Sequence, residues 1–462
     1  MSTARSVARA PWLTLIALCL GFFLMLLDST IVAVAIPAIS EELDAGAAAT
    51  VWVNSGYLFA YAVPLLFAGR WGDRIGARRV YLIGLVLFIV ASAACGLSGS
   101  LPALTISRVA QGLGAALMTP QTLAIIRRTF PAATLPIALG VWGSVGGVAA
   151  AAGPLIGGLL VGVAGWPSIF LVNVPLGALA LVLALLWVPV APRGTSTIPF
   201  ASVALSALGV LGVIVAVHEV ATLPILASIA LAALGVGLIV LALRVQPRDP
   251  HHALIPRQLL HSRGFVRATL GATAASFVVG SALIPVMLAL QDGRGLSVMQ
   301  ATLAILPLGV GSAVTAPFAG VSVARWGPRP VAVIGTTALA ASTCATATAI
   351  QTSAPVWTIA AAMALFGFAN SFVWSPLATA AMTAIEPEYA GSASGAYNAT
   401  RQVGAVLGSA TVAALIATGG MALSLWALGV VAVASVVVVV GLPSAAAAEG
   451  SGDTVSASPS RR

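Results

Sequence analysis

The chain has 462 residues, of which 60% are hydrophobic and only 7% are charged, and its mean hydropathy is +1.06. Soluble domains carry about a quarter of their residues as charged side chains, so this composition excludes a soluble globular enzyme, a disordered chain and a nucleic-acid-binding protein. The net charge of +9 comes from 21 basic and 12 acidic residues, and its meaning depends on where those few charges lie.

Fourteen apolar stretches are each long enough to cross a membrane as a helix, which takes about 20 residues. The first stretch follows Arg5 and Arg9 as a signal peptide would, but it is too long for one and contains Asp28, so we expect a retained helix. The sequence therefore predicts an all-α integral membrane protein with helices at 12–36, 51–69, 80–99, 103–126, 136–162, 169–190, 199–217, 222–243, 265–290, 299–324, 330–350, 356–384, 396–418 and 421–441.

The basic residues are all arginines, and nearly all of them fall on one side of this topology. With the N-terminus in the cytoplasm, 18 of the 21 lie on the cytoplasmic side, Arg294 lies outside, and Arg108 and Arg401 lie within helices. The positive-inside rule therefore favours fourteen spans with both termini in the cytoplasm. The absence of lysine excludes a Walker A phosphate loop and a lysine Schiff base. Codon usage in a GC-rich bacterial genome is the simple explanation for it.

Neither the cysteines nor the histidines predict a metal site. Each of the three cysteines lies in an apolar run, which is typical of a core residue. The loop at 244–264 contains three histidines without a carboxylate cluster or a cysteine, and we expect it to be solvated. These residues are Cys19, Cys95 and Cys344, and His251, His252 and His261.

A short repeat divides the chain into two halves. The pattern R-W-G-x-R occurs at Arg70–Arg74 and again at Arg325–Arg329, each time in a predicted cytoplasmic loop. Chance could produce so short a match, but the spacing of eight spans suits two six-helix halves with two extra helices between them. The predicted domains are a six-helix bundle at 1–190, two linker helices at 191–245, a second six-helix bundle at 246–442 and a disordered tail at 443–462.

Four motifs resemble the major facilitator superfamily, and specifically its fourteen-helix drug:proton antiporters. They are a first-helix motif, a cytoplasmic loop motif, a fourth-helix motif and a fifth-helix antiporter motif. Within this family, the resemblance points to methylenomycin-type antibiotic resistance exporters. The motifs stand at Leu27–Pro37, Gly69–Arg79, Arg108–Gly114, and Gly143–Gly147 with Gly153–Gly158, and the segments Gly165–Gly177 and Asn398–Gly404 add to the resemblance.

The sequence also departs from the family pattern. The first-helix motif has Ala33 where relatives usually have asparagine, and Pro167 and Ser168 replace the last two residues of a common Trp-Arg-Trp run. In the second copy of the loop motif, Pro328 stands opposite Asp73.

The resemblance implies a transporter rather than an enzyme. It would export hydrophobic or cationic drugs by alternating access, with the proton gradient as energy source and no other cofactor. Its partners would be a small hydrophobic or amphipathic substrate and the lipid bilayer of the cell membrane, with no nucleic acid and no obligate protein partner. A proton-coupled importer of a small metabolite and a non-transporting membrane protein are the alternatives.

Asp28 and Arg108 are the candidates for proton coupling. A carboxylate within a membrane span is costly and by default indicates function. From the predicted boundaries, Asp28 lies ~12 Å and Arg108 ~8 Å from the outer ends of their helices. A facing arginine favours the charged carboxylate, and loss of that partner favours protonation. The alternative is a fixed ion pair that never titrates.

Two further motifs have roles that the sequence leaves open. The cytoplasmic loop motif is predicted to latch that side shut, with Asp73 meeting helix N-terminal amides, or else only to fix topology. The fifth-helix glycines allow close helix packing beside a proline that can bend the helix, and the resemblance adds a role in preventing leak. The residues are Gly69, Gly72, Asp73, Arg74, Gly76, Arg78 and Arg79, and Gly143, Gly147, Gly153, Pro154, Gly157 and Gly158.

A substrate cavity is expected between the two halves near the middle of the membrane. Its candidate residues are polar or aromatic side chains on spans that are expected to face the centre. The tryptophans and the tyrosine among them could equally belong to interfacial belts. The candidates are Asn54, Tyr57, Gln121, Trp142, Asn370, Trp374, Asn398 and Arg401.

Overall fold

The computed structural model describes every residue except 1, 45–46, 191–198, 219–222, 250–251 and 444–462, so most of the predicted tail lies outside the described residues. The described part is almost entirely helical. Its helices are α1 Ser2–Glu42, α2 Ala47–Ala62, α3 Leu65–Ile75, α4 Ala77–Gly96, α5 Leu101–Thr129, α6 Leu135–Ala164, α7 Ser168–Leu171, α8 Asn173–Trp187, α9 Phe200–His218, α10 Ile225–Val245, α11 Arg257–His261, α12 Arg263–Val279, α13 Leu283–Gln291, α14 Val298–Trp326, α15 Pro328–Gln351, α16 Val356–Thr383 and α17 Ala390–Val440, with a short 3-10 turn at Pro387–Tyr389.

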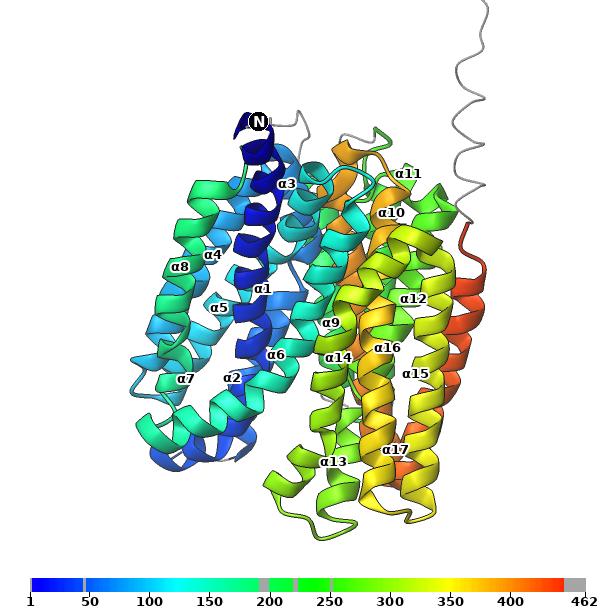
Figure 1. Cartoon of the computed structure of the whole chain (residues 1–462). Helices are drawn as coiled ribbons and strands as arrows, with labels where there is room; N and C mark the ends of the chain where they lie inside the picture. Colours follow the sequence, from blue (N-terminus) through cyan, green and yellow to red (C-terminus); the bar gives the residue numbers. More distant parts are fainter. Residues whose placement is uncertain (1, 45–46, 191–198, 219–222, 250–251, 444–462) are drawn as a thin grey trace, which may run out of the picture.

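The helices form two bundles side by side, with α1 to α8 in one and α12 to α17 in the other (Figure 1). The N-terminus lies at the end drawn at the top, which we call the upper end. At this end the bundles touch through glycines, because a side chain at Gly140 would meet the backbone of Gly320. In Figure 1 the two bundles diverge toward the lower end.

The hairpin of α9 and α10 packs beside both bundles. Val210 and Ile214 of α9 are buried against Ala62 of α2, and Val406 of α17 packs on the same cluster. The two helices approach each other closely at Gly209 and Gly235, as small residues allow in membrane helices. One linker helix therefore contacts both halves along one side.

Eleven helical segments of the described chain are long and apolar enough to cross a membrane, and Leu135–Gly146 and Phe200–Ala216 are shorter apolar helices. The expected single span at 51–69 is instead two short helices, α2 and α3, separated at Pro64. Proline lacks the backbone N–H that would continue the helix. The expected span at 265–290 is likewise interrupted, between α12 and α13, around Gly280.

Two boundaries differ from the predicted loops. The segment from Gly69 was expected to be a loop, but it is helical to Ile75, and the chain turns only at Gly76, where φ is 101°. In the second copy of the repeat the turn comes earlier, at Gly327 with φ 80°. The reason is Pro328, which is favoured at the first position of a new helix and cannot continue the old one.

The last two predicted spans are joined without a loop. α17 runs from Ala390 to Val440 and is broken only at Gly420, where φ is 80° and ψ is −178°. This conformation lies in a region that glycine adopts at little cost. The break falls between the predicted spans 396–418 and 421–441, so the boundary between them was predicted correctly.

Candidate functional site

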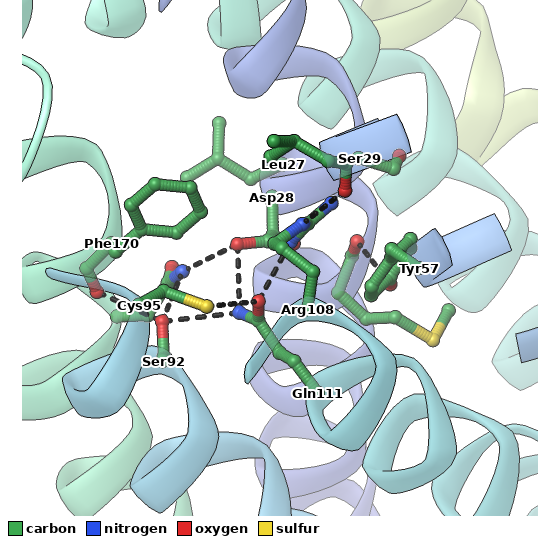
Figure 2. A network of polar contacts seen from close by, with 12 residues as sticks. Leu27, Asp28, Ser29, Tyr57, Ser92, Cys95, Arg108, Gln111 and Phe170 are labelled. Atoms are coloured by element: carbon green, nitrogen blue, oxygen red, sulfur yellow. Dashed lines mark hydrogen bonds and ion pairs between the residues drawn. The ribbon is translucent and has the colours of Figure 1, made fainter. Parts of the chain in front are cut away.

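Asp28 is fully buried on α1 and is surrounded by donors (Figure 2). Its Oδ2 pairs with Nη1 of Arg108 at 2.5 Å. Its Oδ1 accepts hydrogen bonds from Nε2 of Gln111 at 2.8 Å and from Nδ2 of Asn173 at 2.9 Å. An ionised carboxylate can only accept hydrogen bonds, so this donor set fits the charged form of Asp28.

Arg108 of α5 is buried as completely as Asp28. Its Nε donates to the carbonyl of Val53 at 3.1 Å, and its Nη1 also donates to Oε1 of Gln111 at 2.7 Å. The ring of Tyr57 lies 4.2 Å from the guanidinium carbon, within the range of a cation–π contact. Nη2 of Arg108 is buried and has no hydrogen-bond partner among the described residues.

Three residues of this network were missed in the sequence. Ser92 accepts hydrogen bonds from both Gln111 and Asn173, each at 3.1 Å, and donates to the carbonyl of Phe170 at 2.9 Å. Gln111 lies within the fourth-helix motif, three residues after Arg108, and so on the same helix face. Asn173 and Ser92 are polar residues in apolar spans, and this is the sequence feature that could have identified them as site residues.

Asp73 joins the two bundles at the upper end. Its carboxylate accepts hydrogen bonds from the backbone N–H groups of Gly391 at 3.0 Å and Ser392 at 2.8 Å, and from the hydroxyl of Ser392 at 2.7 Å. These groups are in the first turn of α17, where the helix dipole attracts an anion. Asp73 lies beyond the predicted second span, and burial raises the pKa of its carboxyl although the Ser392 hydrogen bonds and the Arg128 charge oppose that rise.

Three arginines that were given no role beyond the positive-inside rule strengthen this junction. Arg128 of α5 forms an ion pair with Asp73 at 3.2 Å, and Arg127 donates to the carbonyl of Met382 at 2.8 Å. Arg70 is buried and donates to the hydroxyl of Ser392 at 3.2 Å. The contacts of Arg127 and Arg70 cross from the first bundle to the second, and Arg128 also reaches across through a 3.3 Å hydrogen bond to the carbonyl of Pro387.

The other residues of the loop motif have different surroundings. A side chain at Gly69 would collide with Gly391, and one at Gly72 would collide with Gln121, so both glycines allow close helix contact. Arg78 donates to the carbonyl of Leu185 within its own half. Arg74 and Arg79 are exposed.

The fifth-helix glycines of α6 divide into two groups. A side chain at Gly153 would collide with Thr30, and one at Gly157 would come 2.8 Å from Ile31, both on α1. Gly143 lies against the second bundle, since a side chain there would come 3.6 Å from Trp374, whereas Gly158 has open space around it. The packing around Gly147 and Pro154 lies outside the described part of the structure.

Two cavities lie where the bundles face each other. A cavity of 290 Å³ is lined by both halves and includes Trp142, Asn370, Trp374 and Arg401. A second, of 140 Å³, includes Tyr57, Asn398 and again Arg401. These six residues are predicted cavity residues that the fold brings together. The larger cavity, at 290 Å³, is just below the ~300–1,000 Å³ of ligand pockets, and the smaller one, at 140 Å³, is well below it.

The two other predicted cavity residues do not line these cavities. Gln121 is buried and donates to the carbonyl of Ala68 at 2.7 Å, so it holds α5 against α3. Asn54 is on α2, and its side-chain oxygen is buried without a hydrogen-bond partner among the described residues. Tyr57, by contrast, lies between the second cavity and Arg108, so its ring separates this cavity from the Asp28 network.

The sequence matches the model of one protein family, described as Major Facilitator Superfamily, over residues 18–409 and 269–458. It is 40% identical over 414 residues to an uncharacterised MFS-type transporter of Mycobacterium tuberculosis, covering 89% of this chain and 71% of the relative. It is 36% identical over 419 residues to a tetracenomycin C resistance and export protein of Streptomyces glaucescens, covering 88% and 76%.

One further relative and one solved structure are also similar to this chain. A methylenomycin A resistance protein of Streptomyces coelicolor is 29% identical over 405 residues, covering 87% of this chain and 84% of the relative. The solved structure of a proton:xylose symporter superposes with a TM-score of 0.68 at 16% identity, covering 95% of this chain and 97% of that one. At this identity the superposition shows the shared fold alone.

Proposed function

The chain belongs to the Major Facilitator Superfamily, and from this premise we propose that it exports hydrophobic drug-like compounds in exchange for protons, by alternating access. The observation that carries the proposal is a fully buried carboxylate–arginine pair, Asp28 and Arg108, behind the wall of a cavity between two bundles. Relatives named for tetracenomycin export and methylenomycin resistance support the direction of transport.

The proposal includes a topology. The protein would cross a bacterial cell membrane fourteen times, with residues 51–69 of α2 and α3 as the second span, Asp73 beyond its end, and both termini in the cytoplasm. The upper end in Figure 1 is then the cytoplasmic face. In this conformation the Asp73 junction closes that face, so the cavity would communicate with the outside, as after release of an exported compound.

The donors around Asp28 support the proposed proton coupling. Protonation removes the negative charge that Arg108, Gln111 and Asn173 are arranged to stabilise, and so it weakens the contacts between α1, α5 and α8. Helices held by that charge can then shift relative to one another. Arginine itself stays protonated, so within this pair Asp28 would carry the transported proton. The positive charge of Arg108 would stabilise the ionised carboxylate of Asp28.

Export can be tested by expressing the chain in a drug-sensitive bacterial host and measuring resistance over a panel of antibiotics, with and without an uncoupler. We expect resistance to hydrophobic compounds that the uncoupler abolishes. Efflux that is insensitive to the uncoupler would contradict proton coupling. The absence of resistance over the whole panel would instead favour the import of a metabolite.

The role of Asp28 can be tested with Asp28→Asn and, as a matched control, Asp292→Asn at an exposed site. We expect the Asp28 variant to lose export against a gradient and substrate-driven proton uptake while it stays in the membrane. The Asp292 variant should keep both. If Asp28→Asn still exports against a gradient with proton uptake, Asp28 is a fixed anchor.

A further inference from the structure

Arg401 is a membrane-embedded cation without an acidic partner among the described residues. It lies on α17 and lines both cavities between the bundles. Its hydrogen bonds are a 3.5 Å contact to the hydroxyl of Ser276 and a 3.4 Å contact to the side-chain oxygen of Asn398. Both are longer than typical hydrogen bonds. Its guanidinium also lies 4.1 Å from the centre of the Trp374 ring, and none of these contacts neutralises the charge.

The other intramembrane arginine shows how this fold neutralises such a charge. Arg108 is fully buried and pairs with the carboxylate of Asp28. Arg401 is only half-buried and faces the cavities. A charge inside a membrane protein is costly unless it is paired or hydrated. The guanidinium of Arg401 is therefore placed to pair with a negative group that enters the cavity.

Among the residues that the structure describes, no acidic side chain lines either cavity. Asp28, on the neighbouring helix α1, is fully buried, and its oxygens are already bonded to Arg108, Gln111 and Asn173. A cationic compound in the cavity would therefore meet a positive charge and no accessible negative one. The electrostatics of the cavity oppose the cationic substrates that the family resemblance implies.

The rest of the wall of the larger cavity is mostly apolar and includes four aromatic side chains, and its polar members are Thr30 and Asn370. Phe22 and Trp142 are stacked, with ring centres 4.6 Å apart, and Phe366 and Trp374 line the same cavity from the second bundle. Flat aromatic surfaces bury a large apolar area and pack well against other rings. This wall fits a planar aromatic compound.

From these contacts we infer that the exported compounds are aromatic acids, whose anion pairs with Arg401 while the ring system packs among Phe22, Trp142 and Trp374. The inference rests on the proposed export function and narrows its substrate class. The competing role for Arg401 is a purely structural clamp on Trp374, which would leave ligand charge without effect.

The test compares three probes of one shape: 2-naphthoic acid, its methyl ester and 2-naphthylmethylamine, which are anionic, neutral and cationic at neutral pH. Their binding to the purified full chain in nanodiscs is measured by equilibrium dialysis, against empty nanodiscs. A charge-assisted pair favours the acid by about tenfold or more. We expect this preference over the amine, and we expect Arg401→Gln to remove it while ester binding stays within about twofold.

Two further variants complete the design. Arg401→Lys keeps the charge and should keep most of the preference for the acid. Arg325→Gln removes an exposed charge from the same half, outside both cavities, and should bind all three probes as the wild type does. Unchanged ester binding shows that a variant has kept its fold.

Three outcomes would overturn the inference: a wild type that binds the amine at least as tightly as the acid, one that binds none of the probes, or acid binding that Arg401→Gln leaves unchanged. Uncoupler-sensitive export of cationic or neutral drugs without a preference for acids would overturn the inference and leave the proposed function standing. Absence of uncoupler-sensitive export for every compound, acids included, would overturn the proposed function itself.

Discussion

At the scale of single residues, Tyr57 is the partition between the cavity and the buried ion pair. Its ring lies over Arg108 and lines the smaller cavity, while its hydroxyl makes only a 3.3 Å contact to the carbonyl of Met25. We predict that Tyr57→Ala lets water reach Asp28 and causes proton flux without substrate, several-fold above wild type. Tyr57→Phe keeps the ring, and its proton flux without substrate should remain at the wild-type level.

The measurement is proton entry into proteoliposomes that contain a pH-sensitive dye, with a pH gradient and no substrate. Equal proton flux through the alanine and phenylalanine variants would show that the ring does not seal the network.

The polar residues of the site were only partly predictable from the sequence. Asp28 and Arg108 stand out because a charge in an apolar span is rare, whereas Asn173 is one neutral amide among many polar residues. Its hydrogen bond to Asp28 joins residues 145 positions apart, and a single sequence does not show which distant residues meet. For the same reason the sequence did not predict that Asp73 contacts Ser392. It did predict the type of contact, a carboxylate at a helix N-terminus.

At the scale of elements, α6 offers a matched test of helix packing. A methyl group at Gly153 would collide with Thr30 of α1, whereas one at Gly158, about one and a half turns further along, would meet no atom of a neighbouring element within 4 Å in the described part of the structure. We predict that Gly153→Ala destabilises the protein by about 1–3 kcal/mol through overpacking and lowers export. Gly158→Ala should change neither. Thermal unfolding in detergent and drug efflux are the measurements, and equal effects at the two positions would contradict the packing role.

Most helices were predicted from apolar length alone, because about 20 apolar residues fit a membrane. The predicted helix boundaries were wrong where a proline interrupts a span or where tertiary packing extends a helix. Pro64 divides the second span, and the chain keeps a helical path through Gly72 and Asp73 because those residues pack against α5 and α17. That packing is tertiary, so their glycine and charge content alone indicated a loop.

The junction of α3 with α17 gives a prediction for the upper end. Asp73→Asn removes the charge that binds Arg128 and the first turn of α17, so the closed arrangement of that end should become less populated. A cysteine at position 394, where Ser394 is fully buried, should then react with a maleimide several-fold faster, in a background without the natural cysteines. Asp292→Asn, at an exposed site, is the control.

Acid should act on this junction in the same direction as the Asp73→Asn change. Protonation of Asp73 removes the same charge, and burial raises the pKa of this carboxyl, so labelling should increase at milder acidity than an exposed aspartate would require. A labelling rate that is equal in wild type and Asp73→Asn would contradict the latch.

At the scale of the whole molecule, the two proposals together predict that transport carries charge. An entering proton and a leaving organic anion both move positive charge inward, so export of the acid moves one charge more than export of its neutral ester, which is twice the charge for an exchange of one proton per molecule. A membrane potential supplies about 2.3 kcal/mol per charge per 100 mV. A negative interior should therefore accelerate export of 2-naphthoic acid more than export of its methyl ester.

This can be measured in proteoliposomes at equal pH on both sides, with the potential set by a potassium gradient and valinomycin. Arg401→Gln should lower export of the acid without changing the response of the ester to the potential, because its role is in binding the anion. Asp28→Asn should abolish potential-driven proton exchange with either compound. Equal acceleration of acid and ester would mean that the acid crosses with a proton of its own, and the anion would then not be the transported form.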